Sequence, residues 1–350
     1  PQEGRPGRFF EIRHLPFSIV FEVKLTVCNR FSALLPASFT RCGKKQGQNF
    51  QFPGRISIFE GRNQNEREMG SGLENTRRTL NEGFQGAFST AKALVASSWH
   101  NGHLRGIPRK HDRLVILGNG PSLASVLESK REFLQDKDLM CVNFFADSDT
   151  YADLKPAHYI ATDPIVFQNP EQSDRLFGAL AEKTDWELRF FAPWRYRNET
   201  AWQERLHANP LIRLHFINTT PAEGSDAWCF PLYRRMLAMP RPRNVLIPAL
   251  MTALWMGYPT IYTAGVEHSW HRQLWVKDDN VLMINDTHFY DAGTPQNRRH
   301  GDFTVGSLFR SLAIAFDGYH AVERYARQQG SRIYNITEGS FIDAFERKKI

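Results

Sequence analysis

The chain has 350 residues, of which 41% are hydrophobic and 23% charged, an ordinary composition for a globular protein with a sizeable core. No apolar run reaches the length of about 18 residues that a transmembrane helix needs, so we expect no membrane span. The net charge is +7, but residues 1–68 carry +5 of it, and the nearly neutral remainder predicts no nucleic-acid partner. The four cysteines show no CxxC spacing, which argues against a zinc site or a disulfide framework and fits a reducing cytoplasm.

Residues 1–68 differ in composition from the rest of the chain. They contain nine Phe but no Asp, Trp or Tyr, and Gly, Pro and Gln interrupt every candidate element. Met69 follows this segment directly, and a regular helical pattern begins soon after it. We therefore expect residues 1–68 to be an upstream extension of the reading frame. The alternative is a genuine but irregular N-terminal domain.

Residues 69–112 predict a helix followed by a linker. From Leu73 onward, apolar side chains recur at four- and seven-residue steps and form one helical face, namely Leu80, Phe84, Phe88, Val95 and Trp99. Asn101-Gly102 is expected to end this helix as a C-cap, and a polar, basic linker follows it. We expect the apolar face of this amphipathic helix to pack on the main domain.

Residues 113–350 predict one α/β domain. Short apolar runs alternate with helical patterns, and the expected strands are 113–117, 139–145, 158–162, 187–192, 212–217, 260–264 and 332–336. The expected helices include 122–134, 244–256, 305–329 and 341–347. This alternation indicates a Rossmann-like, mainly parallel sheet with helices on both faces. Ligands of such sheets bind outside the carboxyl ends of the strands.

The first expected strand ends in a glycine-rich loop, Gly118-Asn119-Gly120-Pro121-Ser122. Glycines let the backbone approach a phosphate closely, Pro121 fixes the turn, and Ser122 is a good N-cap for the next helix. The N–H groups that begin this helix favour an anion, and Asn119 adds an amide. The loop matches neither GxGxxG nor a Walker A motif, and a purely structural turn is the alternative.

Three further polar residues stand at the ends of expected elements. Asn143 ends the apolar part of the second strand, Asp163 follows the third strand, and Asn244 begins the apolar helix 244–256. Each alone has an ordinary structural explanation as a backbone bridge, a turn former or a helix cap. Because strand ends in a parallel sheet meet at one edge, their convergence with the glycine loop favours a nucleotide-binding site.

Histidines gather after the strand 260–264. His268, His271, His288 and His300 fall within 33 residues, and His serves as a general base near neutral pH. We take His288, His268 and His300 as candidate catalytic residues, although a loop histidine is more often structural. No pair has the helical i, i+4 spacing of an HExxH motif, so we expect no metal site.

Four segments along the chain are similar to those of a known group of proteins. They are VILGNGPSL at 115–123, CVNFF at 141–145, MGYPTIYTAGVE at 256–267 and RIYNITEGSFID at 332–343. In this order they resemble the bacterial family-42 sialyltransferases and the related MptE-like domains. Those domains occur in 6-hydroxymethylpterin diphosphokinases and in flagellin-modifying glycosyltransferases. The resemblance covers about residues 113–347.

The resemblance implies a cytidine-monophosphate (CMP) sugar donor and roles for several residues in holding it. Asn119 and Ser122 would hold the donor phosphate and ribose, and Asn143 would contact the nucleotide. Asp163 stands where the family has a polar strand-end residue. Asn244 stands at the start of the helix that faces the donor. That helix continues with Val-Leu-Ile at 245–247, where the family has small hydroxyl residues and glycine.

The resemblance also implies a catalytic base. His288, in the context Asn-Asp-Thr-His-Phe-Tyr, resembles the family's base, and His300 is its rival. His268 and Trp270 occupy the neighbourhood of two family tyrosines that steady the departing phosphate.

The sequence therefore predicts a bacterial glycosyltransferase for cell-surface glycan, such as lipopolysaccharide or capsule. Its donor would be a CMP-activated acidic sugar, similar to sialic acid or another keto-sugar acid, and its acceptor a glycan or a lipid-linked glycan. No cofactor is expected. The expected location is the cytoplasm or the inner face of the membrane, and both a peripheral membrane contact and a homo-oligomer stay open.

Two other functions remain as alternatives. An MptE-like 6-hydroxymethylpterin diphosphokinase would use ATP and magnesium, with Asp163 as a metal ligand, but a single carboxylate is thin support for such a site. A nucleotide-binding relative without catalysis would fit the apolar residues at 245–247.

Overall fold

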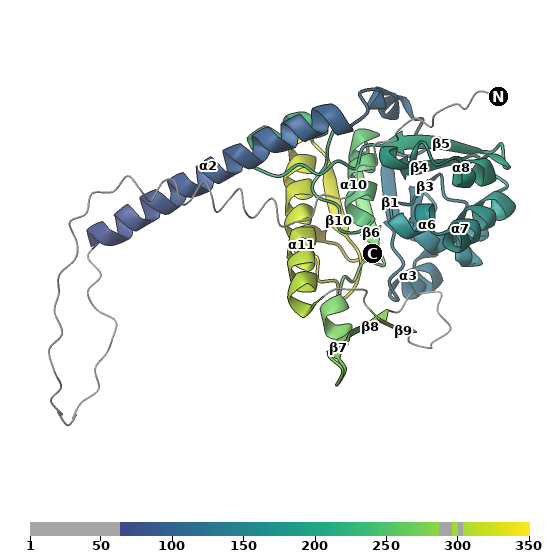
Figure 1. Cartoon of the computed structure of the whole chain (residues 1–350). Helices are drawn as coiled ribbons and strands as arrows, with labels where there is room; N and C mark the ends of the chain where they lie inside the picture. The colour runs from purple at the N-terminus through teal and green to yellow at the C-terminus, as the bar shows by residue number, and fades with distance from the viewer. Residues whose placement is uncertain (1–63, 287–295, 300–303) are drawn as a thin grey trace, which may run out of the picture. The chain divides into compact units, whose positions relative to one another are not determined.

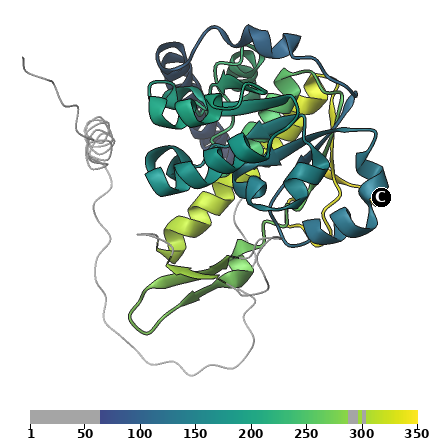
Figure 2. The ribbon, with the colours of Figure 1, turned by 90° about the vertical axis from the view of Figure 1, so that its right-hand side faces the viewer.

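The computed structural model of this chain describes residues 64–286, 296–299 and 304–350. They belong to one compact unit, Asn63–Ile350, which Figures 1 and 2 show from two directions. The expected N-terminal extension 1–68 lies outside the described residues except for 64–68, which are helical. Among the described residues, no helix is both long and apolar enough to cross a membrane.

An eight-stranded sheet forms the centre of the described unit, in the order β11-β10-β6-β1-β2-β3-β4-β5. Its strands pair in parallel throughout. They are β1 (Arg113–Leu117), β2 (Asp138–Val142), β3 (His158–Ile160), β4 (Leu188–Pro193), β5 (Ile212–Ile217), β6 (Thr260–Ala264), β10 (Arg332–Asn335) and β11 (Glu346–Arg347). Helices lie on both sides of the sheet (Figures 1 and 2), so the α/β, Rossmann-like architecture predicted from the sequence is confirmed.

The order of the strands reverses beside β1. The chain proceeds outward from β1 through β2, β3 and β4 to β5, and then returns to the other side of β1 with β6. Leu117, at the end of β1, is therefore flanked by Cys141 of β2 and Ala264 of β6. Loops that leave neighbouring strands in opposite directions open a crevice, which is where open α/β sheets bind ligands.

Two apolar cores cover the sheet, one on each face. Leu114 and Ile116 of β1 belong to the first core, whereas Val115 and Leu117 belong to the second. This alternation follows the two-residue period of a strand. All four side chains are fully buried because helices cover both faces, which is why β1 is a continuous apolar run in the sequence.

The helices divide between these two cores. On the first core lie α9 (Asp226–Arg234), α10 (Leu246–Trp255) and α11 (Val305–Gln328). On the second lie α3 (Leu123–Ser129), α4 (Arg131–Leu134), α5 (Thr150–Leu154), α6 (Pro164–Gln168), α7 (Pro170–Lys183) and α8 (Thr200–His207). Short 3₁₀ turns are η2 (Asn101–Gly106), η3 (Asn143–Asp147), η4 (Trp194–Tyr196) and η5 (Trp270–Gln273).

Helix α2 (Gln64–Ala96) contradicts the packing expected from its sequence. The face expected to be buried is open to solvent, since Leu80, Phe84, Phe88 and Val95 are 60 to 89% exposed. Trp99, beyond the helix, is exposed as well. Helical periodicity locates an apolar stripe correctly, but it does not reveal whether the domain itself covers that stripe.

The face of α2 that packs on α9 consists of small residues instead. Ser89 and Ala93 are buried there, and a Cβ added at Gly86 would overlap the Trp228 ring. Ser89 is also tied to the backbone of Glu223 by two hydrogen bonds of 3.0 and 2.8 Å. Side chains this small let the two helices approach closely. The helix ends at Ala96, so the expected C-cap at Asn101-Gly102 is wrong, and those residues begin η2 instead.

Two other expected helices differ from the structure. The helix expected at 122–134 breaks at Lys130, whose φ of −129° is not helical, into α3 and α4. The closing helix expected at 341–347 is absent, and β11 begins at Glu346. Arg347 donates hydrogen bonds to the carbonyl oxygens of Thr337 and Ile342, which secures an extended chain there.

A small antiparallel sheet follows β6 and was not predicted. It consists of β7 (Leu274–Val276), β8 (Leu282–Asp286) and β9 (Gln296–Arg299), in that order. Its strands are short, and the charged and polar residues of β9 give no apolar alternation that would mark a strand.

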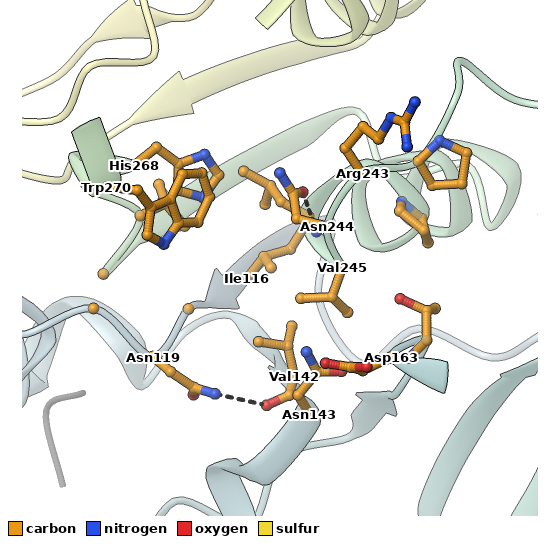
Figure 3. A pocket seen from close by; sticks show the side chains of 18 of the residues that line it. Ile116, Asn119, Val142, Asn143, Asp163, Arg243, Asn244, Val245, His268 and Trp270 are labelled. Carbon is orange, nitrogen blue, oxygen red and sulfur yellow. Dashed lines mark hydrogen bonds between the residues drawn. The ribbon is translucent and has the colours of Figure 1, made fainter. Parts of the chain in front are cut away.

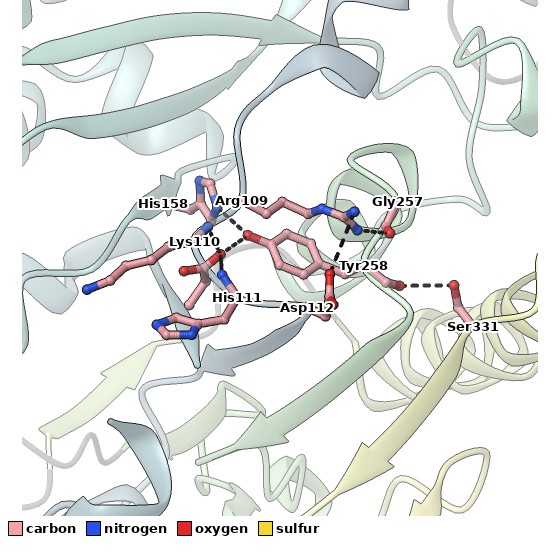
Figure 4. Close-up of polar contacts among 9 residues, drawn as sticks. Arg109, Lys110, His111, Asp112, His158, Gly257, Tyr258 and Ser331 are labelled. Atoms are coloured by element: carbon pink, nitrogen blue, oxygen red, sulfur yellow. Dashed lines mark hydrogen bonds and ion pairs between the residues drawn. The ribbon is translucent and has the colours of Figure 1, made fainter. Parts of the chain in front are cut away.

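A buried polar network ties the amino ends of β2 and β3 to the segment before β1 (Figure 4). Tyr258 donates a hydrogen bond of 2.6 Å to the Asp138 carboxylate, which also accepts the backbone N–H groups of Lys110 and His111. The Tyr258 oxygen lies 2.7 Å from Nε2 of His158, a fully buried side chain. Because the tyrosine proton goes to Asp138, the imidazole is the donor to the tyrosine oxygen.

Candidate functional site

A cavity of about 600 Å³ opens at the carboxyl ends of the strands, at the reversal of strand order beside β1. Its lining comes from the residues that follow β1, β2, β3, β4 and β6 and from the start of α10. Figure 3 shows His268 and Trp270 on one side of the cavity, with Arg243 and Asp163 on the other. Of the predicted residues, it is lined by Gly118, Asn119, Gly120, Pro121, Asn143, Asp163, Asn244 and His268.

The glycine loop faces this cavity, but the N–H groups of Gly118, Gly120 and Ser122 are engaged within the protein. The N–H of Gly118 is donated to the Ala264 carbonyl at 2.8 Å and that of Gly120 to the Gly265 carbonyl at 2.9 Å. The N–H of Ser122 is donated to the Glu267 carboxylate at 2.5 Å. Ser122 stands at the N-cap position of α3 as predicted, but its backbone is helical and its side chain makes no capping hydrogen bond. Ser122 does not line the cavity.

Glu267 explains why the loop needs its glycines. A Cβ at Gly120 would overlap the Glu267 carboxylate, and one at Gly118 would meet the Gly265 backbone. The second carboxylate oxygen, Oε2, is buried and accepts no hydrogen bond from the described residues. A carboxylate therefore already stands where the sequence suggested a phosphate, and a second anion in direct contact with Ser122 would meet electrostatic repulsion.

The two asparagines hold the strand ends and leave polar groups toward the cavity. Asn119 donates its amide to the Val142 carbonyl at 3.3 Å, which bridges β1 and β2, while its Oδ1 is buried and without a partner among the described residues. Asn143 has a φ of 46°, a left-handed conformation that Asn tolerates better than most residues. Its Oδ1 accepts the Thr162 N–H at 3.4 Å. Both residues therefore have the structural role considered for them and also line the cavity, and their contact with a nucleotide stays a prediction.

Asp163 and Asn244 act as local caps at the rim. Asp163 accepts the Ile165 N–H at 3.1 Å and caps α6. Asn244 accepts the Leu246 N–H at 3.0 Å at the start of α10. Among the described residues, no three His, Cys, Asp or Glu side chains come together in a way that could hold a metal ion.

His268 belongs to a hydrogen-bonded chain that fixes its protonation state. The Asn244 amide donates to the Tyr319 hydroxyl at 2.6 Å, and that hydroxyl lies 2.8 Å from Nδ1 of His268. Tyr319 is fully buried and has no other described acceptor for its proton, so it donates to Nδ1. The imidazole consequently carries its own proton on Nε2.

This arrangement makes His268 a hydrogen-bond donor rather than a base. Burial lowers the pKa of His268 to about 3, so the ring is neutral at physiological pH. The ring stacks on Trp270 at 4.4 Å between centroids, which holds its orientation. A neutral Nε2–H at the cavity wall can donate to an oxygen of a ligand, whereas Nδ1 is occupied and cannot accept a proton from one.

Two arginines of the cavity were missed in the sequence analysis. Arg195 stands two residues after β4, and Arg243 precedes α10. Both are exposed, and neither forms an ion pair with a carboxylate within the described part of the chain. Glu267, three residues after β6, was missed as well. A search for polar residues a few positions beyond each strand end would have found Arg195 and Glu267.

The other histidines are not part of the described cavity. The ring of His271 packs edge to face with that of Phe341, with 4.4 Å between the ring centroids, and His271 does not line the cavity. His288 and His300, the two other candidate catalytic residues, lie outside the described residues.

Taken together, these features define an α/β protein whose parallel sheet has a cavity with several polar side chains at its switch point. Comparison with models of protein families gave no match, and comparison with curated proteins gave none either. Among solved structures, one described as "Structure of MAf glycosyltransferase from Magnetospirillum magneticum AMB-1" is similar, with a TM-score of 0.42 and 11% identity. The similarity covers 69% of this chain and 34% of that one, so this chain spans about a third of that protein's length.

Proposed function

We propose that the cavity binds a nucleotide-activated acidic sugar and that the protein is a glycosyltransferase. One observation carries the proposal: Arg195 and Arg243, which form no ion pair with a carboxylate among the described residues, share a cavity with the side-chain amides at the strand ends. A CMP-linked nonulosonate, or a similar keto-sugar acid, has two anionic groups, the phosphate and the sugar carboxylate. Two guanidinium groups suit these two anions, because Arg binds both phosphates and carboxylates in a bidentate manner.

The pocket geometry changes where the phosphate is expected to bind. Since Glu267 occupies the glycine loop, we place the two anionic groups of the donor toward Arg243 and Arg195, with the phosphate at Arg243, rather than against the Ser122 N–H. Asn119 and Asn143 then remain for the base and ribose. The neutral Nε2–H of His268 would donate to an oxygen of the departing phosphate.

The proposed reaction is a single displacement. An acceptor hydroxyl of a glycan or lipid-linked glycan attacks the anomeric carbon, the bond from that carbon to the phosphate oxygen breaks, and CMP leaves with the electron pair. The acceptor proton passes to a base. We propose His288 for this role on the sequence resemblance, with His300 as its rival. The arginines and His268 stabilise the charge that develops on the phosphate, a preorganised electrostatic contribution.

A ligand panel tests the binding step. We expect CMP to raise the melting temperature of the full chain without magnesium, and to do so more than CDP, UDP, GDP or ATP. A ligand specific for the native state adds about 2.7 kcal/mol of stability at a hundredfold excess over its dissociation constant. A shift with ATP and magnesium alone would instead support the diphosphokinase.

Arginine variants test whether the guanidinium groups of the cavity bind the phosphate. Arg243→Ala should weaken CMP binding by about tenfold to a hundredfold, because a charge-assisted hydrogen bond contributes about 1.5–3 kcal/mol. Arg197→Ala is the matched control: Arg197 is also exposed, lies over the Trp194 ring and does not line the cavity. Equal effects of the two substitutions would contradict the proposed phosphate position.

Transfer itself is tested with a CMP-activated acidic sugar and a glycan acceptor. His288→Ala should sharply reduce turnover while the CMP-induced shift survives. Unchanged turnover would remove His288 from the mechanism, and CMP binding without any transfer by the unmodified chain would favour a non-catalytic relative.

A further inference from the structure

The exposed face of α2 carries a continuous apolar stripe, which we define as Leu80, Phe84, Ala87, Phe88, Ala91, Leu94 and Val95. All seven are exposed, with fractions from 45 to 89% for the five larger ones. At 3.6 residues per turn they fall within an arc of about 120°. Gly86, Ser89 and Ala93, which pack on α9, lie on the opposite side of the helix.

We propose that this stripe pairs with the same stripe of a second copy of the chain, so that two α2 helices form a symmetric dimer contact. The inference is independent of the function proposed for the cavity. It turns the general expectation of a homo-oligomer into a particular surface.

The spacing of the stripe favours a helix as its partner. Leu80, Ala87 and Leu94 are separated by seven residues, and Phe84 and Ala91 stand four residues after the first two. These are the a and d positions of a heptad, whose side chains insert between those of a facing helix. The two alanines in the middle leave room for the large side chains of the partner.

The exposed area is the second argument. A fully buried aromatic side chain covers about 150–250 Å². With Phe84 and Phe88 about three quarters exposed, the whole stripe presents on the order of 700 Å² of apolar surface. The largest apolar patch of a typical monomer is about 300–600 Å², whereas a stable interface buries about 800 Å² on each partner. The stripe is therefore close in size to one half of a stable dimer interface.

The charge distribution disfavours a lipid surface as the partner. Helices that lie on membranes combine their apolar face with a face rich in Lys and Arg. Along Gln64–Ala96 the four Lys and Arg residues are balanced by four Glu residues, and the face that carries Gly86, Ser89 and Ala93 is covered by α9. A self-complementary apolar stripe without charge is what a two-fold contact requires.

Sedimentation of the full-length chain tests the proposal. We expect the unmodified chain to be dimeric at micromolar concentration and Phe84→Glu to be monomeric. Because Phe84 is 77% exposed, this substitution should leave the melting temperature of the monomer nearly unchanged. Gln85→Glu adds the same charge one residue further along, outside the stripe, and should stay dimeric.

A second measurement does not depend on the charged variant. Ala87→Cys should form an intermolecular disulfide under mild oxidation, because facing d positions, to which Ala87 belongs, bring the two Cα atoms close enough for an S–S bond, whereas Gln85→Cys should not. The Gln85→Cys variant carries the same four native cysteines, of which Cys141 and Cys229 are buried, and therefore also controls for disulfides that they form. If the unmodified chain is monomeric, the proposal is overturned. Binding of that monomer to anionic lipid vesicles would then identify a membrane surface as the partner of the stripe. A dimer that Phe84→Glu leaves intact would do the same.

Discussion

Acid should destabilise the protein through His158, and the size of the effect follows from its surroundings. The side chain is fully buried, its Nε2–H donates to Tyr258, and its Nδ1 has no hydrogen-bond partner among the described residues. Burial, together with the positive charges of Arg189 and His215, lowers the pKa of His158 from 6.5 to about 3. Protonation would place a charge on Nδ1 without an acceptor, since the Asp138 carboxylate is separated from the ring by Tyr258.

The sign and the pH window follow from linkage. Between pH 6.5 and about 3 the unfolded chain binds a proton at His158 and the folded chain does not, so the free energy of unfolding falls as the pH falls. At pH 5, which is about 1.5 units below the unfolded pKa, His158 alone should cost about 2 kcal/mol relative to pH 7.5.

His158→Gln isolates this contribution. Glutamine still offers an N–H to Tyr258 but does not titrate, and its loss of packing is the same at both pH values. We expect urea denaturation to show that the unmodified chain loses about 2 kcal/mol more than the variant between pH 7.5 and pH 5. An equal loss in both proteins would refute the reasoning, because it would mean that His158 titrates alike in the folded and unfolded states.

Two further predictions concern the cavity. Gly120→Ala should displace the Glu267 carboxylate from the Ser122 N–H and lower stability by about 1.5–3 kcal/mol. In a Glu267→Ala background the same substitution should cost much less, and additive effects in denaturation would contradict the contact. Nitrogen NMR of the ring of His268 should show the Nε2–H form with no titration above pH 5, in keeping with its pKa of about 3. In Tyr319→Phe that preference should be lost, and an Nδ1–H ring in the unmodified chain would disprove the chain of hydrogen bonds.

The centre of the sheet was predictable because its central strands are buried on both faces. Such strands are short apolar runs between turn residues, as in β1 and β6, and their alternation with helices leaves few arrangements. The edge of the sheet that holds the cavity could be inferred in the same way, since it follows from strand direction alone.

What the sequence could not reveal were contacts between residues far apart in the chain. The glycine loop has the composition of a phosphate site, but Glu267 reaches it from 145 residues away and uses one of its N–H groups. The pKa of His268 likewise depends on burial that no local pattern reports. The apolar face of α2 was recognised correctly, yet the opposite face, with Gly86, Ser89 and Ala93, packs on the domain instead. The sequence did not indicate this face, because such small side chains give no periodic apolar pattern.

The reversal of strand order beside β1 also has a consequence for how the protein folds. The strands β1 to β5 follow one another in the sequence, so this half of the sheet can assemble by short steps. The pairing of β1 with β6 must close a much longer loop. Such closures are slow, because the chain loses conformational entropy before the stabilising contacts between the two strands can form. A ligand that touches the loops after both strands cannot bind before this closure. Its binding during refolding would therefore report the joining of β6 to β1, separately from the pairing of β1 to β5.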